Sequence, residues 1–566
     1  MDLERDLRWE FTEISKLEEE LWAMKSRITW LVKGDRNTGF YHTLALVRRR
    51  RNQITCMKDR VGNWIQGEKE IAEFIRNGYV ELFSSSHSHS TLAIWDPPFW
   101  QTYLKEEDLA ILTRPVSNED ISTGILSLKA FKAPGFEGLH AGFFQRFWLL
   151  VGELVRNEVK QSFTFNRIPK CLNRTVVTLI PKCGNPESFG HYRPISLCNT
   201  VYKIVSKIIV AWIRPFLPNL ISPLQIAFVL GRKGIDNAII VQEIVHSMSK
   251  AKGSSGYMAI KINLDKAYDC MEWSFIRDTL TFFKFPSQLI ALILSRVSSS
   301  SISILFNGGA LEPFHHFRGI RQGDPLSPYL FILCMEVLGA MITEKCSPKL
   351  WNLIKSSQGG IAFSHLVFED DLVLFARADQ KNFVAVKDVL ESFCKLSGQK
   401  VSQDKSWVFF SPNVSADGRT DLCNILGFRS TLSLGKYLGF PIKHSGMPQD
   451  FVFILERVQG RLAGWKANLL SFAGRLVLTQ AVTSTIPNYA MQCCALLAKV
   501  LTNVDRLSHN FLWGSSENKK KLHLVGWSKI TKPKKEGGLG VQVAKAKNIA
   551  LLAKLNWHLT SKPNSL

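Results

Sequence analysis

The chain has 566 residues, enough for three or four domains of ordinary size or for one large body with several lobes. Hydrophobic residues make up 46% of it and charged residues 21%, which excludes wholesale disorder and collagen-like repetition. Lys and Arg number 71 against 48 Asp and Glu, so the net charge is +23. A surplus of this size predicts a polyanionic partner, and nucleic acid is the obvious one.

The cysteines and the apolar stretches exclude several other classes of protein. The 11 cysteines contain no Cys-x-x-Cys pair, which disfavours a zinc finger or a dense disulfide scaffold. The first residues are charged and lack the apolar run of a signal peptide. The longest apolar stretch, Tyr329 to Ile342, spans 14 residues and contains Glu336. It is shorter than the roughly 20 residues that cross a bilayer, so we expect an intracellular protein without a membrane span.

The N-terminal region predicts one long amphipathic helix followed by a basic cluster. Apolar residues recur at heptad spacing between Leu7 and Leu31, and the helix is expected to end near Gly34. Arg48 to Arg51 then place four cations together, which indicates either phosphate contacts or a plain surface or targeting signal. Residues 84–90 (SSSHSHS) predict a flexible joint.

Strand-like and helix-like segments alternate from about residue 176 to 440, and the region after 443 is helical and basic by pattern. Within Tyr257–Leu264 the apolar residues at even positions share one face, which predicts a half-buried strand. Asp265-Lys266-Ala267-Tyr268-Asp269 follow at its end. Gly319 to Pro328 form a glycine-containing loop that leads into an apolar helix, and glycine lets a backbone approach a ligand closely.

The strongest local signal is the segment Ser364–Phe375, where two short apolar runs flank Glu369-Asp370-Asp371. This pattern predicts a β-hairpin with carboxylates at its tip. Adjacent carboxylates repel each other unless a cation lies between them, and Mg²⁺ is a hard cation that needs few protein ligands. The alternative for this segment alone is a solvated acidic turn.

Further motifs occur in order along the chain: Lys132–Gly135, Leu179–Lys182, Tyr192–Leu197, Gln225–Phe228, Ser397–Lys400, Tyr437–Gly439, Gly464–Lys466 and Phe511–Gly514. This ordered set, with the segments above, resembles the reverse transcriptases of plant LINE-type (non-LTR) retrotransposons over nearly the whole chain. A maturase-like or telomerase-like polymerase shares the palm, but the N-terminal connector and the last two motifs favour the retrotransposon enzymes. The resemblance implies an α+β right-hand polymerase with fingers, palm and helical thumb, preceded by an N-terminal helical connector.

The resemblance also implies a division into four segments. These are a helical, basic connector (1–90), an N-terminal extension with the Pro-Gly-x-x-Gly motif (91–161), the reverse transcriptase domain of fingers and palm (162–442), and a helical thumb with a basic C-terminal region (443–566). By the same comparison the chain corresponds to the central fragment of a larger polyprotein. The resemblance also leads us to expect that this sequence does not include the endonuclease and ribonuclease H regions of full-length family members.

The implied activity is RNA-directed DNA polymerisation, in which dNTPs are added to a primer 3′ end on an RNA template by two-metal phosphoryl transfer. The implied cofactors are two Mg²⁺ ions, with Mn²⁺ as an alternative. The implied partners are an RNA template, a DNA primer and the RNA/DNA hybrid, in the nucleus and cytoplasm.

Site residues follow by matching the family motifs position by position. Asp370, Asp371 and Asn263 occupy the catalytic, metal-binding positions. The nucleotide-binding positions are Lys182, Arg193, Tyr268, Gln322, Gly323 and Lys405, and Tyr268 is the aromatic that crowds the sugar 2′ position. The primer and template positions are Arg321, Tyr437, Leu438 and Gly439, and the basic patch that would contact nucleic acid is Arg48, Arg49, Arg50 and Arg51.

Two departures from the family pattern predict an impaired enzyme. Asn263 stands where the family has a metal-binding aspartate, and an amide oxygen carries no net charge. Even the loss of an outer partner typically lowers metal affinity or activity about 10- to 100-fold, so the loss of a direct ligand should lower it further. Glu369 stands where a small or apolar residue is usual. The alternative function is therefore that of an inactive retroelement relic that only binds RNA or RNA/DNA hybrid.

Overall fold

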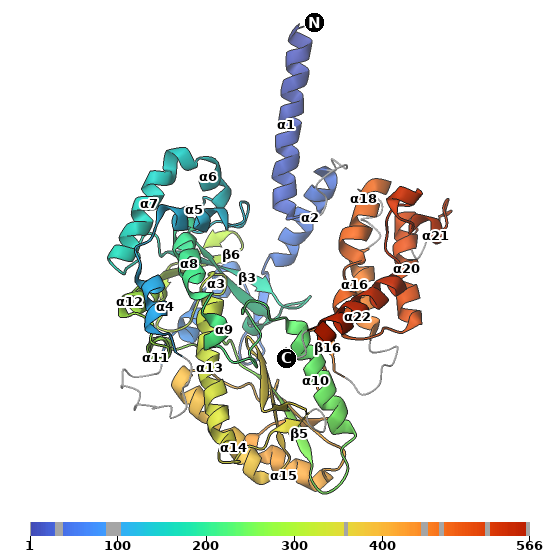
Figure 1. The fold of residues 1–566 in the computed structure, drawn as a ribbon. Helices are drawn as coiled ribbons and strands as arrows, with labels where there is room; N and C mark the ends of the chain where they lie inside the picture. The colour runs from blue at the N-terminus through green and yellow to red at the C-terminus, as the bar shows by residue number, and fades with distance from the viewer. Residues whose placement is uncertain are drawn as a thin grey trace. The chain divides into compact units, whose positions relative to one another are not determined.

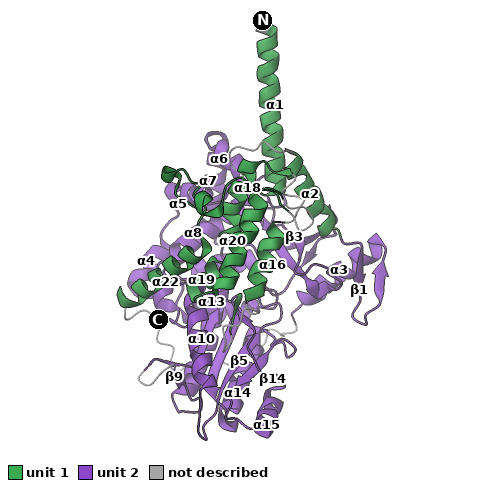
Figure 2. Cartoon of the chain, turned by 90° about the vertical axis from the view of Figure 1, so that its right-hand side faces the viewer, with its two compact units in different colours: residues 1–53, 439–566 green, residues 54–438 purple. Residues whose placement is uncertain are grey.

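The computed structural model describes residues 2–28, 38–85, 103–355, 360–442, 451–462, 469–515 and 521–561. The chain forms two compact units, residues 1–53 with 439–566 and residues 54–438 (Figure 2). The predicted helix end near Gly34, most of the predicted joint at 84–90, and the Gly464–Lys466 motif lie outside the described residues.

The larger unit contains a first five-stranded sheet with the order β4-β3-β6-β7, in which β8 also pairs with β6. Its strands are β3 (Thr175–Pro181), β4 (Tyr192–Cys198), β6 (Ser301–Phe306), β7 (Gly309–Ala310) and β8 (Phe314–His315). β3 and β4 are antiparallel, while β3 and β6 are parallel. Helix α3 (Glu68–Leu82) buries Ile71, Ile75 and Tyr79 in the same apolar cluster as strands β3 and β6. The region after residue 53 is thus anchored to this sheet.

A second five-stranded sheet has the order β11-β12-β5-β13-β14. Its strands are β5 (Tyr257–Asn263), β11 (His365–Phe368), β12 (Asp371–Arg377), β13 (Trp407–Phe410) and β14 (Arg429–Thr431). The predicted strand and hairpin are both confirmed, because β5 is central and β11 pairs antiparallel with β12. Met258, Ile260 and Ile262 of β5 are buried, whereas Lys261 and Asn263 on the other face are partly exposed. The alternation of side chains along a strand explains this division.

Helices surround the two sheets of the larger unit (Figure 1). They are α4 (Glu106–Thr113), α5 (Asn118–Leu126), α6 (Ala141–Arg146), α7 (Trp148–Thr164), η1 (Phe189–His191), α8 (Thr200–Ile213), α9 (Leu217–Leu220), α10 (Gly234–Ser249), α11 (Trp273–Phe282), α12 (Ser287–Ser298), α13 (Ser327–Cys346), α14 (Gln380–Ser397) and α15 (Ala416–Leu426). The shorter strands are β1 (Cys56–Lys58), β2 (Trp64–Gln66), β9 (Ile354–Lys355), β10 (Ala362–Phe363) and β15 (Lys436–Tyr437). Helix α13 buries apolar residues on all its sides in the main core, as is typical of a central helix.

The smaller unit is helical and combines the two ends of the chain. Its elements are α1 (Asp2–Ser26), α2 (Thr38–Asn52), β16 (Phe440–Pro441), α16 (Val452–Arg461), α18 (Phe472–Leu478), η3 (Thr479–Thr483), α19 (Asn488–Cys493), α20 (Ala498–Leu512), α21 (Trp527–Ile530), η4 (Lys534–Glu536) and α22 (Ala544–Ser561). Phe40 and Tyr41 of α2 share an apolar core with Leu478 and Phe511. Long-range packing therefore joins the N-terminal helices to the C-terminal ones.

Helix α1 differs in one respect from its predicted amphipathic character. The apolar row along its first turns is solvent-exposed, with Leu7 56% and Ile14 64% accessible. Only its C-terminal end, at Trp22 and Ala23, packs against the core of the smaller unit. Heptad spacing identified an apolar face, but whether that face is covered depends on tertiary packing.

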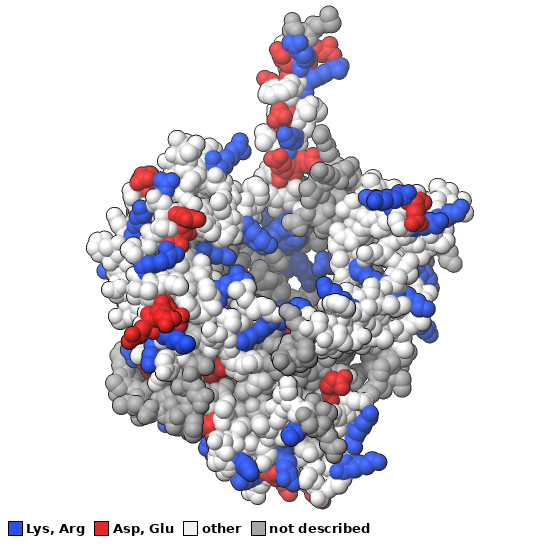
Figure 3. Space-filling model, in the orientation of Figure 1, with Lys and Arg blue, Asp and Glu red and all other residues white. Residues whose placement is uncertain are grey.

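The structure also bears on the cysteines, on membrane spans and on the distribution of charge. All 11 cysteines are free thiols. Among the described residues no helix has both the length and the apolarity needed to cross a bilayer. Lys and Arg side chains are distributed widely over the face of the molecule in Figure 3.

Candidate active site

The side chains that match the metal-binding positions come together at one end of the second sheet. β12 pairs with β5 so that Asp371 lies directly opposite Asn263. Directly opposed residues of antiparallel strands project from the same face with their Cβ atoms about 5 Å apart. Asp370 precedes Asp371 in the two-residue turn between β11 and β12. Residues more than 100 positions apart in the sequence are therefore neighbours because of strand register.

The electrostatics of this edge favour a bound cation. Burial raises the pKa of both Asp370 and Asp371, and the charge of Asp370 raises the pKa of Asp371 further. Lys261, on the same face of β5 as Asn263, acts against this shift at Asp371, and Arg193 does so at Asp370. Raised carboxylate pKa values mean that the two negative charges are incompletely compensated by the protein, which a divalent cation would correct.

The oxygen ligands of Asp370, Asp371 and Asn263 fit a hard divalent cation, but they carry one negative charge fewer than three carboxylates would. Two carboxylates and an amide provide only oxygen ligands, the type that Mg²⁺ prefers. Among the described residues, no group of three or more His, Cys, Asp or Glu side chains is arranged to hold a metal ion. The amide of Asn263 opposite Asp371 can complete a set of oxygen ligands without supplying the third negative charge.

Glu369 adopts an unusual backbone conformation at the tip of the hairpin. Its φ angle is +60°, a value rarely adopted by residues other than glycine. It occupies the first central position of the two-residue turn, where a positive φ matches the twist of the flanking strands. The Tyr268 hydroxyl donates a hydrogen bond to Glu369 Oε1, and the Tyr268 ring stacks on Phe331 with centroids 4.8 Å apart. The Glu369 carboxylate is thus turned toward Tyr268.

The predicted glycine loop is held between β4 and the segment that follows β5. The Ser196 N–H donates to the Gln322 carbonyl at 2.7 Å, and the Ile320 N–H donates to the Tyr268 carbonyl at 2.8 Å. A Cβ at Gly323 would lie 2.7 Å from the Ser196 carbonyl oxygen, and Gly323 has a φ of +116°. Only glycine fits this position without strain, which explains the residue type at the loop.

Asp269 is a buried acid in the same region to which the sequence analysis assigned no role. It is 3% exposed and accepts hydrogen bonds from Gln322 Nε2 at 3.2 Å. Burial raises its pKa to about 7, although Lys266, Lys182 and Arg193 act in the opposite direction. A sequence signal for Asp269 was present, since it directly follows Tyr268 in the segment Asp265–Asp269.

The three predicted nucleotide-binding cations lie near acidic side chains of this region: Arg193 acts on Asp370, Lys182 interacts with Asp269 and Asp265, and Lys405 pairs with Asp265. Lys182 and Arg193 are exposed at the ends of β3 and β4, where the Lys182 N–H donates to the His191 carbonyl at 2.8 Å. Burial lowers the pKa of Lys182, and the charges of Arg193 and Lys405 lower it further. Lys405 forms an ion pair with Asp265 at 3.6 Å. The three cations thus lie within electrostatic range of one another, as a polyphosphate site requires.

Other predicted residues lie elsewhere. Arg321 is 5% exposed and donates to Asn173 Oδ1 at 2.7 Å, so its guanidinium is part of the protein interior. Tyr437 is buried, and Asn237 Nδ2 donates to its hydroxyl at 3.4 Å. Leu438 and Gly439 follow with φ angles of +48° and +81°, which produces a tight turn. Their contacts with primer or template stay predictions.

The Arg48–Arg51 run lies in the smaller unit, in the last turns of α2, where all four side chains are exposed. Arg48 also donates to the Ser26 carbonyl at 2.9 Å, which links α2 to the end of α1. Exposure leaves the guanidiniums of Arg49, Arg50 and Arg51 accessible to phosphates.

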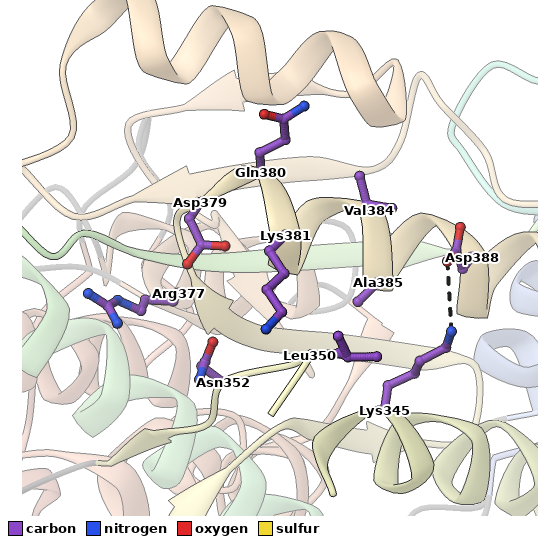
Figure 4. A pocket seen from close by; sticks show the side chains of 10 residues that line it. All are labelled: Lys345, Leu350, Asn352, Arg377, Asp379, Gln380, Lys381, Val384, Ala385 and Asp388. Carbon is purple, nitrogen blue, oxygen red and sulfur yellow. Dashed lines mark ion pairs between the residues drawn. The ribbon is translucent and has the colours of Figure 1, made fainter. Parts of the chain in front are cut away.

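A pocket of about 750 Å³ lies away from these residues, beside the start of α14 (Figure 4). Lys345 and Asp388 form an ion pair across it at 3.7 Å, and Arg377 and Lys381 contribute further positive charge. No predicted site residue lines it. The candidate active site is thus the open, charged edge of the second sheet.

Comparison with known proteins agrees with this geometry. The family model described as reverse transcriptase (RNA-dependent DNA polymerase) matches residues 180–442, a range that contains the whole second sheet and the first sheet except most of β3. An uncharacterised 149 kDa protein of transposon TX1 from Xenopus laevis is 27% identical over 526 residues, which cover 92% of this chain and 39% of that protein.

Two further relatives match shorter parts of the chain. A putative ribonuclease H protein of Arabidopsis thaliana is 54% identical over 127 residues, 22% of this chain and 20% of that protein. The retrovirus-related Pol polyprotein from the type-2 retrotransposable element R2DM of Drosophila melanogaster is 28% identical over 238 residues, 42% of this chain and 21% of that protein. The chain thus spans less than half the length of each of these three relatives.

The family match confirms the expected α+β right-hand polymerase fold. The paired strands, the acidic hairpin and the matches to retrotransposon polyproteins together lead to one conclusion: this chain carries a reverse transcriptase domain, homologous to those of non-LTR retrotransposon polyproteins.

Proposed function

We propose that this chain is an RNA-directed DNA polymerase whose catalytic edge is formed by Asp370, Asp371 and Asn263, and that Asn263 impairs it. The observation that carries the proposal is the register that sets Asn263 directly opposite Asp371 beside the acidic turn. We further propose a plant LINE-type origin, supported by the 54% identity to the Arabidopsis protein, and a site of action in the nucleus and cytoplasm.

In this proposal each group has a defined task. When bound, two Mg²⁺ ions would stabilise the attacking and leaving oxygens of an in-line phosphoryl transfer. Asp370 and Asp371 would hold the ions, with the Asn263 amide as a neutral oxygen ligand. Lys182, Arg193 and Lys405 would neutralise the triphosphate of the dNTP.

The remaining groups shape the nucleotide site. The Tyr268 ring, packed on Phe331, would face the sugar of the incoming nucleotide. Gln322 and Gly323 lie on a loop whose backbone is fixed by hydrogen bonds, so the loop can present one surface to template and nucleotide. The hydrogen bond from Gln322 Nε2 to Asp269, the residue after Tyr268, supports this assignment.

The test is primer extension on a poly(rA)/oligo(dT) duplex with Mg²⁺ and, separately, with Mn²⁺. We expect Asn263→Asp to raise the rate at least about tenfold over the unmodified chain, because it restores a charged ligand. Asn424→Asp, at an exposed position of α15, is the matched control and should leave the rate unchanged. Combining Asn263→Asp with Asp371→Asn should abolish the gain. Equal rates for the unmodified chain and Asn263→Asp would contradict the impairment.

A second candidate function is binding of RNA or RNA/DNA hybrid without catalysis. The observation that favours it is the missing third carboxylate at an otherwise intact edge, combined with a net charge of +23. This function predicts tight binding of primed template by the unmodified chain and no extension with either metal. It is overturned if the unmodified chain extends the primer.

A further inference from the structure

The side chain of Tyr268 is held on two sides by contacts within the larger unit. Its ring is nearly parallel to that of Phe331, with an interplanar angle of 8°. Its hydroxyl donates to Glu369 Oε1, across a sequence separation of 101 residues. The stack fixes the plane of the ring, and the hydrogen bond fixes the direction of its outer end. A tyrosine held only by the stack could slide or rotate within that plane.

The Glu369 carboxylate is itself held in place by the turn that carries it. The backbone of Glu369 has a φ of +60°, and its N–H donates to Gln225 Oε1 at 3.3 Å. Residue types other than glycine persist in this conformation only where surrounding contacts determine it, and such positions cluster at functional sites. The turn therefore presents the Glu369 side chain to Tyr268 from a defined position.

Glu369 also neighbours the two aspartates, so its orientation matters electrostatically. Three consecutive carboxylates repel one another when they point the same way. Burial and the charges of Asp370 and Asp371 raise the pKa of the Glu369 carboxylate, whereas the hydrogen bond from the Tyr268 hydroxyl lowers it and so stabilises the charged form. The same contact therefore orients Tyr268 and directs the extra carboxylate of this chain toward it.

We propose that Glu369 is a positioning residue that holds Tyr268 against the sugar of the incoming nucleotide and so sharpens the preference for deoxynucleotides over ribonucleotides. The inference rests on the proposed function, in which Tyr268 faces that sugar. A ring that cannot move aside excludes a 2′ hydroxyl, whereas a ring free to move makes room for one. The specificity of the site would then depend on a residue that contacts no substrate.

The variants that test this proposal separate the hydrogen bond from the charge. Tyr268→Phe removes only the donor and keeps the stacked ring. Glu369→Ala removes the acceptor and the charge, while Glu369→Gln removes the charge but keeps an oxygen that can accept from the phenol. The double variant Tyr268→Phe/Glu369→Ala tests whether both single changes act through one contact.

The first measurement needs no catalysis. Each protein is mixed with a primed RNA template whose primer ends in a dideoxynucleotide, and the apparent affinity for the next dNTP and for the matching rNTP is read from the stability of the ternary complex. We expect Tyr268→Phe and Glu369→Ala each to lower the dNTP to rNTP affinity ratio about fivefold, the effect of one hydrogen bond. The double variant should lower it no further, and Glu369→Gln should keep most of the ratio.

Two results would overturn the proposal while nucleotide binding is intact. An unchanged dNTP to rNTP affinity ratio in Glu369→Ala shows that Glu369 is not needed to position Tyr268. A loss in Glu369→Gln as large as in Glu369→Ala shows that charge beside the aspartates, and not the hydrogen bond, sets the ratio.

A second measurement distinguishes failure of this inference from failure of the proposed function. Urea unfolding midpoints of the same variants, measured without nucleic acid, report whether the two side chains are coupled. If the shifts in urea midpoint of the two single variants add up to that of the double variant, Glu369 does not position Tyr268, whether or not the enzyme is active. Coupled shifts together with no nucleotide binding by any variant overturn the proposed function, and the role in sugar selection fails with it.

Discussion

Single buried ionisable side chains should affect the stability of this protein. Asp269 is one, with a pKa raised to about 7 by burial, and Glu336 on α13 is another with a pKa of about 7 for the same reason. Neither group was assigned a role from the sequence. Asp269 does lie in a segment that the sequence singled out, but the burial of both groups is a tertiary property that a one-dimensional pattern does not contain.

Asp269 should make the unfolding free energy depend on pH. An aspartate in an unfolded chain titrates near pH 4, so between about pH 4 and 7 the folded chain holds a proton at Asp269 that the unfolded chain releases. The contribution of this group is therefore fully present below about pH 4 and is lost as the pH rises toward 7. The unfolding free energy should therefore decline with rising pH in this range. We expect Asp269→Asn to remove the part of that decline that Asp269 causes, up to about 1.4 kcal/mol per pH unit.

The measurement is urea unfolding of the unmodified chain and Asp269→Asn at pH 5, 6 and 7. Glu336→Gln serves as the matched control, because it should remove a separate share of the same decline. If the Asp269→Asn profile superimposes on that of the unmodified chain, the raised pKa of Asp269 is wrong.

Asp324 provides a second prediction at this scale. Its carboxylate forms a buried ion pair with Arg296 at 3.4 Å and accepts from the Tyr202 hydroxyl at 2.9 Å, and both charged partners are less than 5% exposed. Removing one partner of a buried pair leaves the other charge uncompensated. Asp324→Ala should therefore lower the free energy of unfolding by about 3–5 kcal/mol.

The control is Glu81→Ala, which breaks the exposed ion pair with Arg60. Exposed pairs are largely screened by water and salt, so this change should leave the urea midpoint almost unaffected. Similar losses in Asp324→Ala and Glu81→Ala would show that burial of the first pair has no energetic consequence.

At the scale of elements, the sequence predicted the strand and the hairpin of the active site well. Alternation in β5 and the two apolar runs of β11 and β12 are local patterns, and the strand and the hairpin that they predicted are both present. The shape of the loop Gly319–Pro328 could not be predicted in the same way, because it depends on contacts with β4 and with the segment after β5.

A substitution at Gly323 tests how strongly the loop depends on its contact with β4. Gly323→Ala introduces a Cβ 2.7 Å from the Ser196 carbonyl oxygen at a φ of +116°, so strain and a steric clash combine. We expect a loss of about 1–3 kcal/mol in unfolding free energy. Gly62→Ala is the control, because Gly62 has a φ of +104° but no atom within 4 Å of the added Cβ. Equal losses in the two variants would exclude the clash.

At the scale of the whole molecule, the net charge predicts salt-sensitive binding of nucleic acid. If several phosphates are contacted, affinity for a primed RNA template should fall about tenfold or more between 50 and 200 mM salt. Arg49→Ala/Arg50→Ala removes two exposed cations of α2 and should reduce the slope of log affinity against log salt by about two.

The matched control is Lys381→Ala/Lys387→Ala, which removes two cations from α14, where no nucleic-acid contact is proposed. Fluorescence anisotropy over a salt series measures all three proteins. A slope that the α2 change leaves intact, or that both changes reduce equally, would refute a specific role for the arginine run.

What the sequence determined by itself is the chemistry of the chain and its local patterns: an excess of positive charge, a buried strand, an acidic hairpin and the ordered motifs of a reverse transcriptase. These features depend on residue type and short-range periodicity, which a linear pattern contains. Tertiary structure alone decided that Asp371 lies opposite Asn263, that Glu369 turns to Tyr268, and that α2 shares a core with the C-terminal helices. Strand register, side-chain direction and long-range burial join residues far apart in the sequence, and no local pattern specifies them.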